Sequence, residues 1–161
     1  MEIKERILSK IKELNNDAIV EVSEHLGDLA ITLKEENLLE VARMLKEDPE
    51  LNFRLIEDVT AIDWAKRKER FTVVYHIYSL TNNFRLRLKV NLEGTEVDSL
   101  VPVWKGAEWY ERETFDMYGI KFKGNPDLRR MYMPEEFEYH PLRKEFPVLG
   151  IPGSLPLPKK D

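Results

Sequence analysis

The sequence predicts an α+β fold for a chain of 161 residues. Apolar residues recur at helical spacing in residues 2–14 and 35–47, which indicates amphipathic helices. Residues 84–92 alternate strictly between apolar and polar side chains, which is typical of a half-exposed antiparallel strand. Beyond Gly119 the chain carries seven prolines, which exclude long helices and central strands from this part. Helices and strands are therefore expected before this point, and an extended segment after it.

The remaining elements follow in order along the chain. Pro49 closes the second helix, because proline cannot continue a helical hydrogen-bond ladder. Thr81-Asn82-Asn83 predicts a tight turn between the last two strands. We expect helices at residues 2–14, 35–47 and 106–118, and strands at residues 18–22, 29–33, 53–64, 71–80 and 84–92.

Composition excludes several classes of protein. Hydrophobic residues make up 42% of the chain, which is enough for a core and argues against wholesale disorder. The sequence has no cysteine, which excludes disulfides, zinc fingers, cysteine-bound iron–sulfur clusters and a thiol nucleophile. The net charge of −5 argues against a general nucleic-acid binder. No apolar run is long enough to span a membrane, and the charged N-terminus does not resemble a signal peptide, so we expect an intracellular protein.

The amounts of glutamate and lysine also carry information. The chain has 21 Glu and 14 Lys but no Gln. Together with the absence of cysteine, this bias is typical of hyperthermophile proteins and predicts a thermophilic source. The alternative interpretation is chance in one short chain.

Catalytic motifs are not found in the sequence. It contains neither of the glycine-rich nucleotide-binding patterns, nor a nucleophile elbow, and its three histidines lie far apart. Glu111 and Glu113 are a conceivable acid–base pair, but residues two apart on a helix do not face each other. We therefore predict no catalytic, cofactor-binding or metal-binding residues.

A dense group of charges stands among aromatic residues in the last third of the chain. Charges in apolar surroundings must be paired, because an unpaired buried charge costs several kcal/mol. We predict an ion-paired helix and loop that hold a domain of residues 1–120 to an extended arm of residues 121–161, or to another subunit. The predicted members of this network are Glu111, Arg112, Glu113, Asp116, Asp127, Arg129, Arg130, Arg143 and Lys144.

The same stretch of residues resembles a known family. The run ERETFDMYGIKFKGNPDLRR, from Glu111 to Arg130, closely resembles the signature of the thirty-kilodalton subunit, or C subunit, of respiratory complex I (NADH:quinone oxidoreductase) and of related membrane-bound hydrogenases. The resemblance continues through PLRKEFP at residues 141–147 and reaches back through WKGAEW at residues 104–109. At one position the chain departs from the pattern, because Asn125 stands where the family usually has histidine.

The resemblance implies a fold, a set of partners and a location. The fold is α+β, with helices packed on a mixed, largely antiparallel four- to five-stranded sheet and an extended proline-rich C-terminal arm. The chain would be a structural subunit with no cofactor of its own, peripheral on the cytoplasmic side of the membrane. Its partners would be the large D-like subunit, which helps form the quinone site, and the small iron–sulfur subunit. Iron–sulfur clusters and a flavin or nickel–iron site are expected in partner subunits.

Several alternatives remain open from the sequence. Relatives of this subunit occur in proton-translocating NADH:quinone oxidoreductases, in F420H2 dehydrogenases and in ferredoxin-linked energy-converting [NiFe] hydrogenases, so the electron donor, the acceptor and the pumped ion are not specified. A stand-alone enzyme using Glu111 and Glu113 is a hypothesis from another class. A third hypothesis is a single-stranded nucleic-acid binder that uses the basic strand 85–89 with Phe84.

Overall fold

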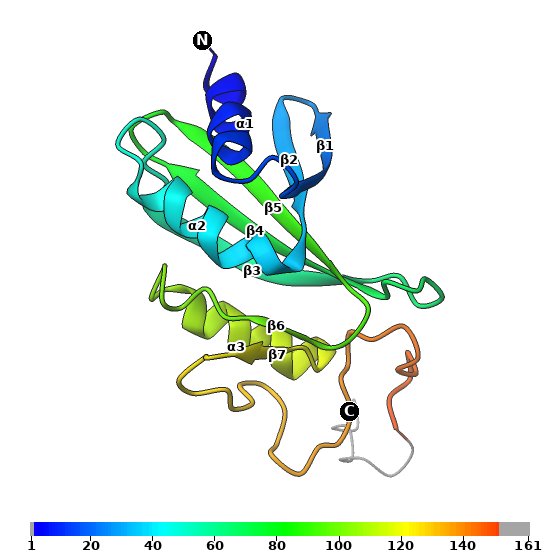
Figure 1. Cartoon of the computed structure of the whole chain (residues 1–161). Helices are drawn as coiled ribbons and strands as arrows, with labels where there is room; N and C mark the ends of the chain where they lie inside the picture. Colours follow the sequence, from blue (N-terminus) through cyan, green and yellow to red (C-terminus); the bar gives the residue numbers. More distant parts are fainter. Residues whose placement is uncertain (1, 152–161) are drawn as a thin grey trace.

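The computed structural model describes residues 2–151, and its centre is a five-stranded sheet (Figure 1). The strand order is β1-β2-β5-β4-β3. Neighbouring strands are antiparallel except β2 and β5, which are parallel. The strands are β1 (Ile19–His25), β2 (Asp28–Leu33), β3 (Leu55–Asp63), β4 (Phe71–Ser79) and β5 (Phe84–Leu92).

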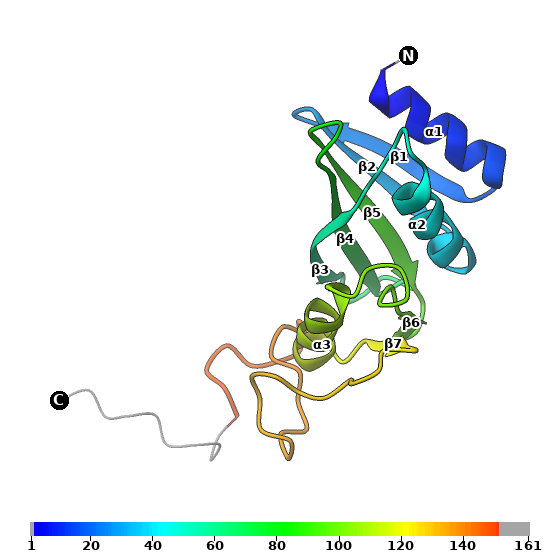
Figure 2. The same ribbon diagram turned by 90° about the vertical axis from the view of Figure 1, so that its left-hand side faces the viewer.

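Two helices cover one face of this sheet (Figure 2). Helix α1 (Ile3–Leu14) buries Ile7 and Ile11, and helix α2 (Leu38–Glu47) buries Val41 and Leu45. A short 3₁₀ turn, Glu35–Asn37, precedes α2. The apolar residues whose helical spacing predicted these two helices are thus the ones that form the core between the helices and the sheet.

The third helix packs against β3, the edge strand of the five-stranded sheet, and lies beside a second sheet of two short strands. Helix α3 (Ala107–Tyr118) follows strand β6 (Glu96–Asp98) and precedes strand β7 (Lys121–Lys123), which pairs in parallel with β6. The Thr114 hydroxyl donates a 2.7 Å hydrogen bond to the Val59 carbonyl of β3. The Trp104 indole donates a 3.0 Å bond to the Phe53 carbonyl. The first bond fixes α3 against β3, and the second ties the loop before α3 to the loop before β3.

The predicted fold class is confirmed: in the described part of the chain, three α-helices accompany a mixed, largely antiparallel sheet of five strands. The boundaries differ by a few residues, most clearly at β1, which continues to His25 beyond the expected end at Val22. Strands β6 and β7 were not predicted, because three residues are too few to show an alternating pattern.

From Gly124 to the last described residue, the chain contains no helix or strand (Figure 2). We call this segment, residues 124–151, the arm. The predicted arm began at residue 121, but residues 121–123 form β7 and belong to the folded domain. Residues 152–161 of the predicted arm lie outside the described residues. Within residues 2–151, no helix combines the length and apolar character needed to cross a membrane.

Candidate interface at the junction of the third helix and the arm

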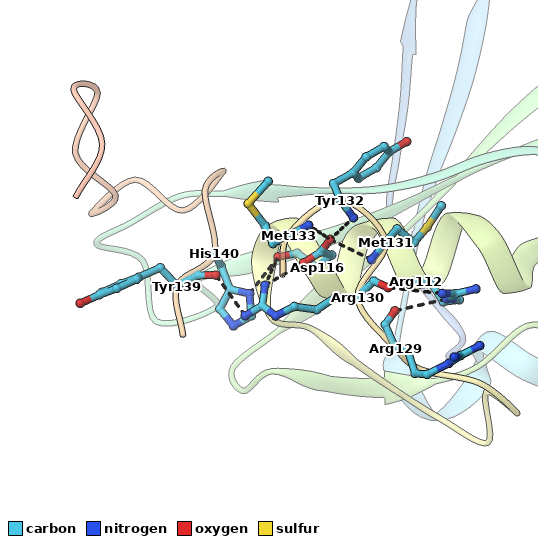
Figure 3. A network of polar contacts seen from close by, with 9 residues as sticks. All are labelled: Arg112, Asp116, Arg129, Arg130, Met131, Tyr132, Met133, Tyr139 and His140. Atoms are coloured by element: carbon cyan, nitrogen blue, oxygen red, sulfur yellow. Dashed lines mark hydrogen bonds and ion pairs between the residues drawn. The ribbon is translucent and has the colours of Figure 1, made fainter. Parts of the chain in front are cut away.

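The carboxylate of Asp116 holds the first part of the arm on the last turn of α3 (Figure 3). Its side chain is fully buried. Oδ2 accepts hydrogen bonds from the backbone N–H groups of Met131, Tyr132 and Met133 at 2.7–3.0 Å. Oδ1 accepts a 2.7 Å bond from Arg130. One side chain therefore fixes the backbone of three consecutive arm residues.

The surroundings of Asp116 also set its charge. Burial alone raises the pKa of Asp116, since it removes the ionised form from water. The backbone N–H groups and the Arg130 guanidinium act in the other direction and prevail, so the pKa lies below its ordinary value. The ionised carboxylate is therefore the form that holds the arm at neutral pH.

Arg112, one turn earlier on α3, holds the stretch of arm backbone that comes just before Met131. Its Nε and Nη2 atoms donate to the carbonyl oxygens of Arg129 and Arg130 at 3.2 and 3.3 Å. Its Nη1 atom lies 3.8 Å from a carboxylate oxygen of Asp127, and its guanidinium stacks on the Trp109 ring at 4.9 Å. Asp127 in turn accepts two hydrogen bonds from Arg129, at 2.6 and 2.7 Å. The predicted charges are therefore linked through backbone groups as well as through ion pairs.

The returning part of the arm closes the C-terminal end of α3. The last carbonyl groups of a helix have no partner inside the helix. His140 Nδ1 lies 3.0 Å from the Asp116 carbonyl oxygen, and Arg143 Nε donates a 2.6 Å bond to the Tyr118 carbonyl oxygen. The arm thus supplies partners that the helix itself lacks.

This contact requires a glycine at position 119. Gly119 has φ +74°, and a Cβ atom added there would lie 2.5 Å from both Arg143 Nη2 and His140 Nε2. For Gly119→Ala we expect about 1–2 kcal/mol lost to the left-handed backbone, with further loss as the arm is pushed away. Gly124→Ala is the matched control, because Gly124 has φ +89° and open space around it. Urea unfolding measures both; equal losses in the two variants would contradict a role for this close approach.

A second buried carboxylate, far away in the sequence, holds the later part of the arm. Asp63 accepts 2.9 and 2.8 Å bonds from Arg70, and 2.8 Å bonds from the backbone N–H groups of Ala65 and Lys144. Arg70 also contacts the carboxylate of Glu145. The hydrogen-bonded Arg70 guanidinium holds the pKa of Asp63 well below its usual range. Sequence reasoning missed this anchor, because 81 residues separate Asp63 from Lys144.

Glu111 is also fully buried, but its partners are neutral. Its carboxylate accepts bonds from Ser99 Oγ at 2.7 Å, Leu100 N at 2.7 Å and Asn125 Nδ2 at 2.8 Å. Burial raises the pKa of Glu111, and these three hydrogen bonds offset only part of the rise. The side chain ties α3 to the loops that follow β6 and β7. Asn125, noted only as a departure from the family pattern, therefore has a structural role here.

The structure brings most of the predicted cluster together. Its joined members are Arg112, Asp116, Asp127, Arg129, Arg130 and Arg143. The predicted pairing of Glu111 with arginine differs from the structure, since neutral donors occupy its oxygens. Glu113 is exposed, and Lys144 takes part through its backbone N–H rather than its ammonium group. Glu111 and Glu113, one buried and one exposed, do not form an acid–base pair.

Large apolar side chains of the arm remain exposed although its backbone is held. The exposed fractions are 60% for Tyr132, 51% for Leu142 and 97% for Leu149. Singly exposed apolar residues are ordinary, but several on one segment mark an interaction surface. The exposed apolar residues of the arm are Tyr132, Tyr139, Leu142, Val148 and Leu149.

The structure gives little support to the two alternative hypotheses, a stand-alone enzyme and a single-stranded nucleic-acid binder. Within residues 2–151, no group of three histidine or acidic side chains is arranged to hold a metal ion. On the basic face of β5, Arg85 pairs with Glu57 at 3.0 Å, and Arg87 lies 3.7 Å from Asp28. The basic charge of this strand is thus largely balanced by acidic neighbours.

Comparison with known proteins now decides the family. The sequence model of the family described as the 30-kDa subunit of respiratory-chain NADH dehydrogenase matches residues 31–151. The chain belongs to this family. The C subunit of the NADH-quinone oxidoreductase of Roseiflexus sp. (strain RS-1) is 44% identical over 144 residues, covering 88% of this chain and 83% of the relative. The corresponding C subunit of Citrifermentans bemidjiense is 41% identical over 147 residues, covering 90% of each chain.

Two solved structures share the fold. A trypsin-resistant fragment (1–134) of Nqo5 superposes with a TM-score of 0.67 at 27% identity, covering 79% of this chain and all of the fragment. A chain of the membrane-bound sulfane sulfur reductase, an archaeal respiratory membrane complex, superposes with a TM-score of 0.76 at 26% identity. That match covers 92% of this chain and 88% of the other. The predicted family is confirmed, and as a member of it the chain is a subunit of a complex I-like respiratory membrane complex.

Proposed function

We propose that the chain is a cofactor-free assembly subunit in the peripheral arm of a complex I-like, proton-translocating NADH:quinone oxidoreductase. It lies on the cytoplasmic side of the membrane. Its arm docks on the large D-like subunit, and its domain lies next to the small iron–sulfur subunit. The iron–sulfur clusters and the flavin belong to partner subunits.

One observation carries this proposal: the arm is held along its backbone but leaves its large apolar side chains exposed. Asp116 and Asp63 fix the two parts of the arm on the domain. Tyr132 and Leu142 then face outward, at 60% and 51% exposure. A segment that is already ordered loses less conformational entropy on binding, which favours a stable interface. The arrangement therefore suits a pre-organised docking surface.

The choice of complex rests on sequence identity. Relatives named as the C subunit of NADH-quinone oxidoreductase are 41–45% identical to this chain, against 26% for the archaeal sulfane sulfur reductase chain. The second candidate is the equivalent subunit of a ferredoxin-linked [NiFe] hydrogenase or an F420H2 dehydrogenase, because the fold is also found in an archaeal respiratory membrane complex named as a sulfane sulfur reductase. Purification of the complex through a tagged chain separates these candidates: NADH-oxidising flavoprotein supports the first, and nickel or F420H2 oxidation supports the second.

The docking role of the arm can be tested with exposed positions that do not affect the core. For Tyr132→Asp with Leu142→Asp in the full chain, we expect normal folding but at least about tenfold less partner subunit recovered with the tagged chain, because two apolar contacts are replaced by charges. The control is Val20→Asp with Leu26→Asp, which changes comparably exposed residues of the N-terminal hairpin. Truncation of the chain before Pro134 removes most of the arm and is expected to reduce recovery of the partner subunit as well. Equal recovery with the arm variant and the control would show that the arm is not the docking surface.

A further inference from the structure

A hollow of about 350 Å³ lies between the C-terminal end of α2, the start of β3 and the beginning of α3. These three element ends meet at the left of the view in Figure 1. The rim carries three cationic side chains, Lys46, Arg54 and Lys105, and the floor includes Ile56 and Trp104. We call this the cationic hollow.

The cations of the hollow have no acidic partner among residues 2–151. Lys46 donates its ammonium hydrogen bond to the Val103 carbonyl oxygen, and Arg54 Nε donates a 2.7 Å bond to the side-chain oxygen of Asn52. Lys105 is exposed. No carboxylate of the described residues lines the hollow or forms an ion pair with any of the three.

The cationic rim and the apolar part of the lining together favour an occupant that is both anionic and apolar. Three cations in one hollow repel each other, and an anion placed among them relieves that repulsion. Two further lining residues, Leu55, which is 43% exposed, and Ile56, which is half-buried, offer an apolar surface beside the charges. A peptide segment in which a carboxylate stands next to an apolar side chain matches both parts. A simple phosphate would satisfy the rim but leave the floor without a partner.

The position of the hollow fits a subunit contact separate from the arm. Helix α3 has 12 residues and is therefore about 18 Å long. Its N-terminal end borders the hollow, and its C-terminal end carries the Asp116 anchor of the arm. Between the two ends, Trp109 is 60% exposed on α3. A neighbour lying along α3 can therefore reach both the hollow and the arm.

We propose that the cationic hollow binds an acidic segment of a neighbouring subunit, in which a carboxylate is adjacent to an apolar side chain. This rests on the membership of the chain in a multi-subunit complex and deepens the proposed function. It adds a second contact, electrostatic in character, to the apolar contact of the arm. Such a contact is expected to weaken with added salt, because screening acts on exposed charges.

The first test identifies the occupant. A photo-crosslinking residue, p-benzoylphenylalanine, replaces Lys105 in the full chain within the assembled membrane complex, and position 66 serves as the control. After irradiation, the adduct is digested and sequenced by mass spectrometry. We expect an adduct with a peptide of another subunit that carries Asp or Glu close to an apolar residue. The proposal is overturned if the yield does not exceed that at position 66, or if the peptide has no carboxylate.

The second test measures the charge requirement. For Arg54→Glu with Lys105→Glu, we expect recovery of the neighbouring subunit to fall about tenfold, as loss of interfacial charge pairs does. Lys12→Glu with Lys66→Glu is the control, with the same change in net charge at exposed positions away from the hollow. Replacing the acidic residue of the crosslinked peptide with lysine is expected to restore recovery in the Arg54→Glu, Lys105→Glu background. Equal recovery with both double variants would overturn the proposal.

The remaining outcomes are distinguishable from one another. If inorganic phosphate, compared with chloride at equal ionic strength, stabilises the full chain but not the hollow variant, and no adduct forms, the hollow is a small-anion site and the proposal fails. The proposed function has its own test in the arm variant at Tyr132 and Leu142. Loss of assembly there, with unchanged assembly for the hollow variant, would leave the function standing and reject this inference.

Discussion

Replacing Asp116 with asparagine is expected to release the arm from α3 and to speed tryptic cleavage within it roughly 100-fold. The carboxylate accepts three backbone N–H bonds and one from Arg130 at a fully buried position. An amide keeps one acceptor oxygen and presents an N–H group where donors already point. A loss of about 3 kcal/mol is the usual size for breaking one partner of such a buried pair.

The measurement is the rate of cleavage at arginines of the arm, followed by mass spectrometry, against the rate within the sheet. Glu113→Gln is the matched control, because Glu113 lies exposed on the same helix. Its cleavage rate should equal that of the unchanged chain. If Asp116→Asn were cleaved at the control rate, the arm would be held by something other than this carboxylate.

Glu111 is expected to make the stability of the folded domain depend on pH in the opposite direction from most carboxylates. Burial raises its pKa above the ordinary value. A carboxyl group with a raised folded-state pKa stabilises the fold most when it is protonated, and that stability is lost as pH rises through the folded pKa. Each unit by which the pKa is raised corresponds to about 1.4 kcal/mol. Asp116 and Asp63, whose pKa values are lowered, lose their contributions only in acid, below the range relevant to Glu111.

Urea unfolding of the unchanged chain and of Glu111→Gln, from about pH 5 to pH 8, tests this expectation. The glutamine side chain of the variant cannot ionise, so the stability advantage of the unchanged chain should shrink as pH rises. Subtracting the two curves removes the contributions of His76 and His140, whose pKa values are lowered chiefly by burial. At the acidic end the variant should be weaker, since its amide N–H faces the Asn125 amide donor. Parallel curves across the range would mean that Glu111 has no raised pKa.

Local patterns predicted the large elements and missed the small ones. The alternation of residues 84–92 and the helical spacing of residues 2–14 correspond to β5 and α1 with nearly unchanged bounds. Such patterns arise because one face of each element is buried and the other is not. Strands β6 and β7 are short and pair in parallel across the whole of α3. Their pairing depends on a contact distant in sequence, and no local periodicity reports it.

The candidate interface was predicted by residue type but not by partner. Charged residues among aromatics indicated a buried network, and Asp116 with Arg130 forms one ion pair of it. Glu111 looked equally suited to an arginine, yet Ser99 and Asn125 occupy its oxygens. Which donor reaches a buried carboxylate is set by where the loops after β6 and β7 come to lie. A sequence pattern does not contain those positions.

The sequence by itself determined the family, the α+β class and the residue types that a buried charge network requires. Periodicity and motifs are local properties of the sequence, so they can be read without a structure. Only the tertiary structure decided that Asp116 and Asp63 are the two carboxylates that hold the arm, that Glu111 lacks a cation, and that Lys46, Arg54 and Lys105 share one hollow. The physical reason is common to all three: hydrogen bonds and charge interactions act over a few ångströms in space, between segments that are not adjacent in the chain.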